Sequence, residues 1–468
     1  MGKTRKISNN HLIQPRPYAN PGLWVGFLLP LCILVSLIKH SVEASKLYQL
    51  TALLTLGILY TTTVFIIRYS STQCTVIPKR SLFLPFIVIT ALYHLHFDKG
   101  LAFSCFASLL STLGFYKLYL FVLSGFPQCF TLGEALACAQ GFTIFIFSSI
   151  VNIMESFKKP PKTTSQMSTI TLQVGLLTVT SFVYMLYKHP SLRSPKLFYP
   201  SLFLALTFLM VIPLQILILK NPLVWIFELF TRDTMQIKIF LYWSLCISAA
   251  VYTLIKQISG AQKASSVVRK TFHILAVLIY VPGLLAECSI LYLASGVVLG
   301  LFIGIETTRL IRLPQVVTFL EDGFSVFRDE KDIGSVALTP MYLLAGVSFP
   351  IWIHPSPCDM TNSAGFNLLP LLSGILSIGV GDSAASYLGA WIGKHKWKGS
   401  FKTIEGTMGC VLSQVLFIYL LMHLGYVDMH LNTLIKVGLA ITVTSVVEAK
   451  TTQVDNLVLP MVMYLMLV

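Results

Sequence analysis

Residues 197–219 read LFYPSLFLALTFLMVIPLQILIL, and no side chain in this stretch is charged. A transmembrane helix needs about 20 predominantly apolar residues to cross the hydrocarbon core of a bilayer. The strands of an outer-membrane barrel would instead show alternating segments of about ten residues. The stretch therefore predicts a membrane-spanning helix, which satisfies its backbone hydrogen bonds within a single segment.

The composition extends this prediction to the whole chain. Of its 468 residues, 55% are hydrophobic and 11% are charged, with a mean hydropathy of +0.76, whereas soluble domains carry about 25% charged residues. These values exclude a cytosolic globular enzyme, a disordered protein and a secreted disulfide scaffold. We expect an all-α, polytopic integral membrane protein with about 13–15 transmembrane helices. The candidate spans are residues 22–40, 48–68, 81–97, 101–125, 132–154, 168–187, 197–219, 238–256, 271–286, 289–307, 336–353, 366–393, 407–425, 433–449 and 455–468.

The charge balance is 34 Lys and Arg against 19 Asp and Glu, a net charge of +15. In a membrane protein this excess indicates basic cytosolic loops and an anionic substrate, so no nucleic-acid partner is expected. Downstream of residue 256 the basic residues gather at 256–270, 309–331, 394–402 and Lys450. Two predicted spans separate each of these segments from the next, so all four are predicted to face the cytosol.

The two halves of the chain differ in where their polar residues lie. Residues 1–236 are mostly hydrophobic helix, and we expect a scaffold or a lipid-binding region there. Residues 237–468 contain four compact polar segments and are expected to form the catalytic region. The nine cysteines are scattered without a CxxC spacing, so neither a metal cage nor a disulfide framework is predicted.

The first two polar segments place ionisable groups at the membrane boundary. Arg269 and Lys270 alone would suit a juxtamembrane anchor, but an ionisable group inside the boundary, such as His273, is usually functional or paired. Asp329 and Asp332 belong to a cluster of acids and cations. A self-neutralised surface loop is the alternative there. Because acids are scarce in this chain, we expect the cluster to contribute oxygen ligands to a divalent cation.

The third segment carries an acid inside a predicted span. Asp382 shares one helix face with Ala385, Ser386, Gly389 and Gly393. Close helix packing explains the small residues, but it does not explain a carboxylate placed about two to three turns into a hydrophobic helix. Such a group needs a cation or a metal ion beside it.

The loop after this helix is predicted to bind phosphate. Lysines supply point charge and glycines let backbone amides approach the oxygens, and a helix that begins near residue 406 would add its dipole. Glu405 would repel a bare anion, so it is expected to bind metal or to orient a lysine. An ordinary basic cytosolic loop is the alternative. The expected nucleotide-binding residues in this loop are Lys394, Lys396, Lys398, Gly399, Lys402, Thr403, Gly406 and Thr407.

The fourth segment runs from Glu448 to Asn456 and interrupts two apolar spans with acids, amides and hydroxyls. A turn in which Asp455 caps the next helix is one interpretation. Because the segment faces the same compartment as the other three, a share in the same site is the other.

In combination and order, these motifs resemble dolichol kinases. The resemblance covers residues 237–468, and two upstream motifs are similar too. A wider group of CTP-dependent lipid kinases and CDP-lipid synthases shares the Asp-x-x-Ala and Glu-Gly-Thr elements. The matching motifs are Arg269-Lys270-x-Phe272-His273, Asp329-Glu330-Lys331-Asp332-x-Gly334, Pro350-Ile351-Trp352, Gly379-Val380-Gly381-Asp382-x-x-Ala385-Ser386, Lys402-Thr403-x-Glu405-Gly406-Thr407 and Glu448-Ala449-x-Thr451-Thr452-Gln453-x-Asp455-Asn456, with Phe130-Thr131-x-Gly133-Glu134-Ala135 and Asn221-Pro222-Leu223 upstream.

The resemblance implies a multi-pass enzyme of the endoplasmic reticulum membrane that transfers the γ-phosphoryl group of CTP to dolichol, making dolichyl phosphate for protein glycosylation. We expect a cytosol-facing site in which Mg²⁺ is held by Asp382 together with Glu405, Asp329 or Asp332. Arg269 and Lys270 would stabilise the leaving diphosphate, and His273 is a candidate general base.

Two alternatives remain at this point. A cytidylyltransferase would use the same groups but direct attack to the α-phosphate, making a CDP-lipid. A transporter with a cytosolic gate is less favoured, because the polar residues gather at one face instead of lining a path.

Overall fold

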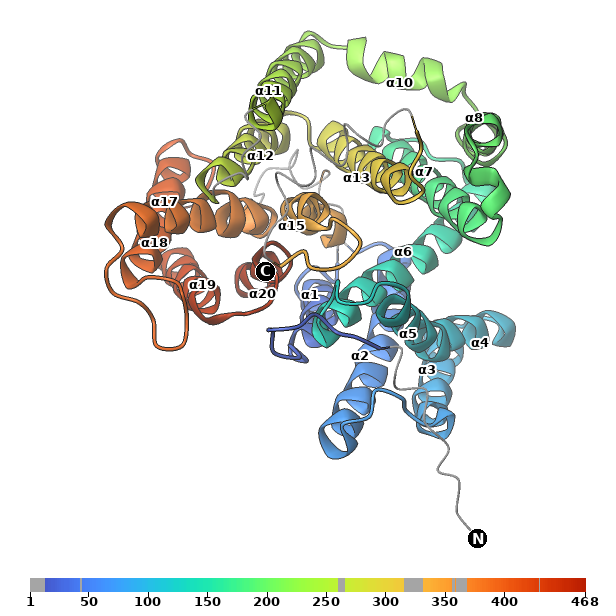
Figure 1. Ribbon diagram of the computed structural model, residues 1–468. Helices are drawn as coiled ribbons and strands as arrows, with labels where there is room; N and C mark the ends of the chain where they lie inside the picture. The colour runs from blue at the N-terminus through green and yellow to red at the C-terminus, as the bar shows by residue number, and fades with distance from the viewer. Residues whose placement is uncertain are drawn as a thin grey trace. The chain divides into compact units, whose positions relative to one another are not determined.

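The computed structural model describes residues 13–42, 44–259, 266–314, 331–355, 358, 368–428 and 430–468. This part of the chain is almost entirely helical, and no strand occurs in it (Figure 1). The helices are α1 (Val25–Lys39), α2 (Lys46–Thr72), α3 (Phe83–His96), α4 (Leu101–Leu109), α5 (Phe115–Gly125), α6 (Leu132–Lys158), α7 (Thr164–Lys188), α8 (Pro195–Ala205), α9 (Ile212–Ile218), α10 (Pro222–Thr231), α11 (Thr234–Ser259), α12 (Ser266–Ala286), α13 (Cys288–Leu310), α15 (Thr339–Ile353), α17 (Ser383–Ile392), α18 (Ile404–His423), α19 (Leu431–Lys450) and α20 (Asp455–Leu467).

The predicted all-α membrane class is confirmed. Among the described residues, ten helical segments are long and apolar enough to cross a membrane. The predicted spans at 22–40, 336–353 and 455–468 correspond to the shorter apolar helices α1, α15 and α20.

The chain divides into two compact units. Unit 1 consists of Met1–Ile38, Lys46–Ser148 and Glu330–Val336, and unit 2 consists of Lys39–Ser45, Ser149–Asp329 and Ala337–Val468. The expected division at residue 236 was drawn from where the polar residues lie in the sequence, not from packing, and it stays a prediction.

In unit 1, buried polar contacts tie the N-terminal segment and α1 to α6. Arg16 donates to Glu134 across 2.7 Å, and both side chains are buried. Glu134 also accepts a hydrogen bond from the Thr131 backbone N–H at 3.0 Å, which caps the start of α6. Farther along α6, Gln140 donates to the Gly26 carbonyl at 2.7 Å. These contacts satisfy polar groups that would otherwise be buried without partners.

In unit 2, glycines let three backbone segments meet. A Cβ atom on Gly346 of α15 would lie 2.1 Å from the Asn456 carbonyl oxygen, and one on Gly374 would lie 2.3 Å from the Gly346 carbonyl oxygen. Only glycine permits such close approach of one backbone to another. The beginning of α20, the middle of α15 and the helix that leads to Asp382 are therefore fixed against one another.

Helices α11 and α12 of unit 2, joined by a short connection, pack against each other as an antiparallel pair. The Tyr242 hydroxyl donates to the Leu278 carbonyl at 3.0 Å, and the Trp243 indole N–H donates to the Ile279 carbonyl at 3.2 Å. Lys270, in the second turn of α12, therefore lies at the opposite end of this helix pair from the first turn of α11.

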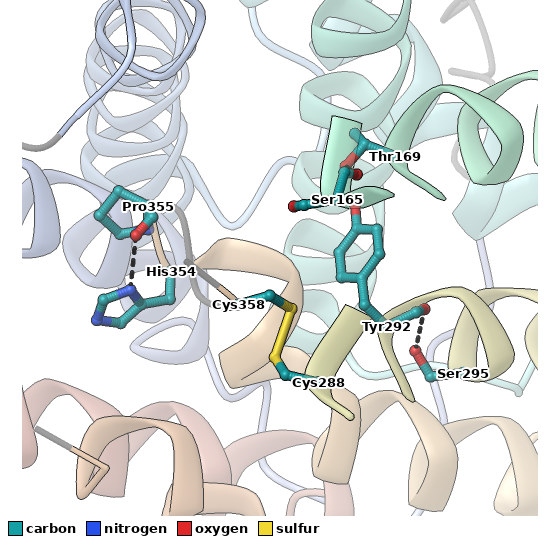
Figure 2. Close-up of a disulfide and its surroundings, with 8 residues drawn as sticks. All are labelled: Ser165, Thr169, Cys288, Tyr292, Ser295, His354, Pro355 and Cys358. Carbon is teal, nitrogen blue, oxygen red and sulfur yellow. Dashed lines mark hydrogen bonds between the residues drawn. A yellow bond between two sulfur atoms is a disulfide. The ribbon is translucent and has the colours of Figure 1, made fainter. Parts of the chain in front are cut away.

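A disulfide joins Cys288, at the start of α13, to Cys358 beyond the end of α15, with a Cα–Cα distance of 5.2 Å (Figure 2). The sequence-based expectation of no disulfide was wrong for this pair. The two cysteines are 70 residues apart, and their spacing forms no motif. The helices bring them together, which scattered cysteines in a sequence do not reveal.

Replacing Gly346 by Ala is expected to lower the free energy of unfolding by about 1–3 kcal/mol, because the new methyl group meets a backbone carbonyl that cannot rotate away. Gly438→Ala in α19 is the matched control, since a Cβ atom there meets nothing within 4 Å. Thermal unfolding in detergent measures both variants. Equal midpoints for the two would contradict the close approach at Gly346.

Candidate active site

Asp382 sits at the end of a π-helical segment, Ile375–Asp382, that continues into α17. Glycines let the neighbouring helices pack closely against this segment. A Cβ atom on Gly379 would lie 2.4 Å from Val277 of α12, and one on Gly381 would lie 2.6 Å from Gln414 of α18. Local π-helical turns are frequent at functional sites. The result is a buried carboxylate carried between α12 and α18.

Two residues of α12 face this carboxylate. Lys270 donates a short hydrogen bond to Asp382. The His273 Nε2 atom lies 3.6 Å from the Asp382 Oδ2 atom and 3.4 Å from the Lys270 ammonium nitrogen. Lys270 and His273 are one helical turn apart, so a single helix face supplies both groups. The predicted requirement for a cation beside Asp382 is met by Lys270.

A second lysine lies between two further carboxylates. Lys402, from the loop between α17 and α18, donates to Glu448 at the end of α19 and, at 3.2 Å, to Asp455 at the start of α20. Oxygen atoms of Asp382, Glu448 and Asp455 all lie within 4.8 Å of one another. We call these five residues, Lys270, Asp382, Lys402, Glu448 and Asp455, the lysine–carboxylate cluster.

The charges in this cluster are closely matched. Three carboxylates face two lysines, and Asp382 and Glu448 are both buried. Burial alone would lower the pKa of Lys402, but the carboxylates of Asp455 and Glu448, followed by Asp382, raise this pKa above its ordinary value. Lys402 is thus held as a cation at neutral pH. The remaining negative charge and the gathered oxygen ligands suit a divalent cation such as Mg²⁺.

The loop from residue 393 to 403 is a short hairpin that ends at the N-cap of α18. Lys396 and Thr403 form an antiparallel bridge, and Gly399 takes the left-handed conformation at the turn, with φ of +77°. The Thr403 hydroxyl accepts the Gly406 N–H at 3.2 Å. That amide is therefore already used by the helix cap, and it is not directed at a ligand.

The remaining predicted loop residues lie apart from the cluster. Glu405 pairs with His395, at 2.6 Å between Oε1 and Nδ1, and is not among the three gathered carboxylates. Thr407 accepts the Trp397 indole N–H at 2.9 Å. The loop lysines other than Lys402 are exposed; they are Lys394, Lys396 and Lys398.

The other predicted ligands have different positions. Arg269 is partly buried, next to Lys270 in α12. Asp332 is buried and belongs to unit 1, whereas the cluster belongs to unit 2. Asp329 lies outside the described residues. Glu448 and Asp455 were not among the expected metal ligands, although they belong to the fourth polar segment, for which a share in the site was one interpretation.

Comparison with known proteins shows a single family. The sequence model of that family, described as dolichol kinase, matches residues 106–396. The dolichol kinase of Homo sapiens is 33% identical over 369 residues, covering 75% of this chain and 68% of the human protein. The dolichol kinase of Saccharomyces cerevisiae is 26% identical over 244 residues, covering 52% and 44%. No solved structure matches this chain.

Replacing Lys402 by Met leaves the buried Glu448 carboxylate without its cation. We expect the free energy of unfolding to fall by about 2 kcal/mol, somewhat less than for a fully buried pair, because 31% of the Lys402 side chain is exposed. Lys398→Met, in the same loop but fully outside the cluster, is expected to change it by less than about 0.5 kcal/mol. Unfolding in detergent with a chelator present measures both. Equal losses would show that Lys402 is not the counter-ion of Glu448.

Proposed function

This chain belongs to the dolichol kinase family, and we propose that it transfers the γ-phosphoryl group of CTP to the terminal hydroxyl of dolichol. The family supports the lipid substrate and the phosphoryl transfer. The choice of CTP rests on the motifs shared with CTP-dependent lipid kinases and CDP-lipid synthases. The observation that carries the proposal is the lysine–carboxylate cluster, because phosphoryl transfer depends mainly on positioning and on charge neutralisation.

We infer that Asp382, Glu448 and Asp455 hold a divalent cation, with Mg²⁺ the best candidate. Carboxylate oxygens are the ligands that this ion prefers, and it usually binds through few carboxylates together with substrate phosphates. When bound, the ion would neutralise charge on the phosphates. This assignment replaces the expected ligand Glu405 by Glu448 and Asp455, because only the latter two lie within 4.8 Å of the Asp382 carboxylate oxygens.

The lysines would then serve the nucleotide. Lys270 pairs with Asp382, and Lys402 pairs with Glu448 and Asp455, so the cluster would offer two ammonium groups to phosphate oxygens. Lys396 and Lys398 are exposed and would add to the positive electrostatic potential around the loop. A loose transition state places little demand on a base.

His273 is the group placed to accept the dolichol proton. Its Nε2 atom lies 3.6 Å from the Asp382 Oδ2 atom, so the ring stands beside the carboxylate that would hold the cation. As the dolichol oxygen bonds to the γ-phosphorus, the bond from that phosphorus to the β–γ bridging oxygen breaks, CDP leaves, and the hydroxyl proton passes to His273.

The polyprenyl chain would lie in an apolar cavity of about 270 Å³ between α18 and α19. It begins at Thr407, one turn from the cap residue Thr403, and at Ser445, one turn before Glu448. Its other lining residues are Met408, Val411, Leu412, Thr442 and Val446. A chain held there would leave its hydroxyl end at the carboxylates.

The disulfide supports a cytosolic orientation of the site. Lys270 lies near the start of α12, and Cys288 lies two residues after its end, so the cluster and the disulfide lie at opposite ends of a helix about 30 Å long. Disulfides persist in the lumen of the endoplasmic reticulum and are reduced in the cytosol. We therefore place the cluster on the cytosolic face of that membrane, in agreement with the basic loops, where the product would serve protein glycosylation.

Purified protein in lipid, given dolichol and CTP labelled only at the γ-phosphate, tests this proposal. We expect label in a lipid monophosphate and release of CDP. Asp382→Asn should reduce transfer by about 100-fold or more, since charge stabilisation by a bound cation contributes several kcal/mol. Asp428→Asn, the same substitution in an exposed loop, serves as the control. Label in pyrophosphate would indicate a CDP-lipid synthase instead, and solute flux without CTP turnover would indicate a transporter.

A further inference from the structure

A second polar site lies in unit 2, where α7 begins and α10 meets α11. Its cavity of about 430 Å³ is lined by Lys162, Lys220 and Arg232, together with Glu228 and Gln236. Among the residues that the structure describes, no ion pair joins the three cations to an acid. Three cations that converge on one cavity indicate an anionic ligand.

Helix α10 places this cavity at a membrane surface. Its ten residues are too few to cross a bilayer, and its first turn is capped by the Asn221 side chain. Trp225 is buried against the cavity, whereas Leu223 and Phe227 are 65% and 68% exposed. A short helix with one apolar exposed side between two membrane spans lies in the interface. The cavity therefore opens at the depth of lipid headgroups.

Two acceptors stand among the cations. The Gln236 side chain is 8% exposed, and its Oε1 atom has no hydrogen-bond partner in the described structure. A buried carbonyl oxygen of this kind is normally satisfied by a donor. Glu228, which also lines the cavity, adds a carboxylate. The cavity thus suits a ligand that carries both an anionic group and an N–H donor.

The position excludes a share in the lysine–carboxylate cluster. Gln236 belongs to the first turn of α11 and contacts Glu287, just after the end of α12. Lys270 lies at the other end of this antiparallel helix pair. By the orientation inferred from the disulfide, the cavity faces the lumen, where the positive-inside rule gives no reason to gather cations.

We propose that this cavity binds the headgroup of a primary-amine phospholipid, such as phosphatidylethanolamine. The phosphate would lie among Lys162, Lys220 and Arg232, and the ammonium group would donate to Gln236 Oε1 and to Glu228. Phosphatidylcholine carries the same phosphate, but its trimethylammonium group has no N–H, so it would leave both acceptors unsatisfied.

The test uses the full chain in nanodiscs of phosphatidylcholine containing a minority of phosphatidylethanolamine, followed by native mass spectrometry. We expect wild-type protein to retain phosphatidylethanolamine selectively. Lys220→Gln and Arg232→Gln should each weaken retention about fivefold, since one interfacial cation contributes roughly this factor. Lys196→Gln, an exposed lysine outside the cavity, should not weaken it.

A further variant tests recognition of the ammonium group separately from recognition of the phosphate. Glu228→Gln should reduce the preference for phosphatidylethanolamine over phosphatidylcholine while total phospholipid retention persists. Equal retention of the two lipids by wild-type protein would overturn the proposal, as would unchanged retention in both cation variants. Displacement of the bound lipid by millimolar inorganic phosphate would identify a site for free phosphate and would also overturn it.

Discussion

The neutralisation of buried carboxylates by lysines is the interaction on which the architecture of unit 2 depends. A chain with so few charged residues gains little from surface ion pairs, yet it buries Asp382 and Glu448 at the end of a membrane-embedded helix bundle. An unpaired charge there would cost several kcal/mol. Lys270 and Lys402 remove that cost, and each lysine comes from a different segment than the acid that it meets.

Backbone packing makes this neutralisation possible. The glycines at 346 and 374 bring α15, α20 and the helix that carries Asp382 into direct contact. Asp455 is fixed because its neighbour Asn456 abuts Gly346. The same packing holds three carboxylates close together, an arrangement that like-charge repulsion opposes unless cations intervene. A ready-made anionic site flanked by lysines is what a metal-dependent phosphoryl transfer requires.

Much of this organisation could be predicted from the sequence. Apolar run lengths gave the membrane class, and helical spacing placed Asp382 in a span that needed a cation. Which other carboxylates join Asp382 could not be predicted, because Glu405 and Glu448 are both acids close in sequence to basic residues. The hairpin turns Glu405 toward His395, a local geometry that spacing does not encode. The Cys288–Cys358 disulfide and the Gln236 cavity were missed for a related reason, since both join segments far apart in the sequence.

The proposed divalent cation site consists of Asp382, Glu448 and Asp455. Mn²⁺ binding to the purified chain, measured by electron paramagnetic resonance without nucleotide, tests this site most directly. We expect one Mn²⁺ site in the wild-type protein that is lost in Asp382→Asn and in Asp455→Asn and kept in Glu405→Gln. Loss in Glu405→Gln with unchanged binding in Asp455→Asn would contradict it.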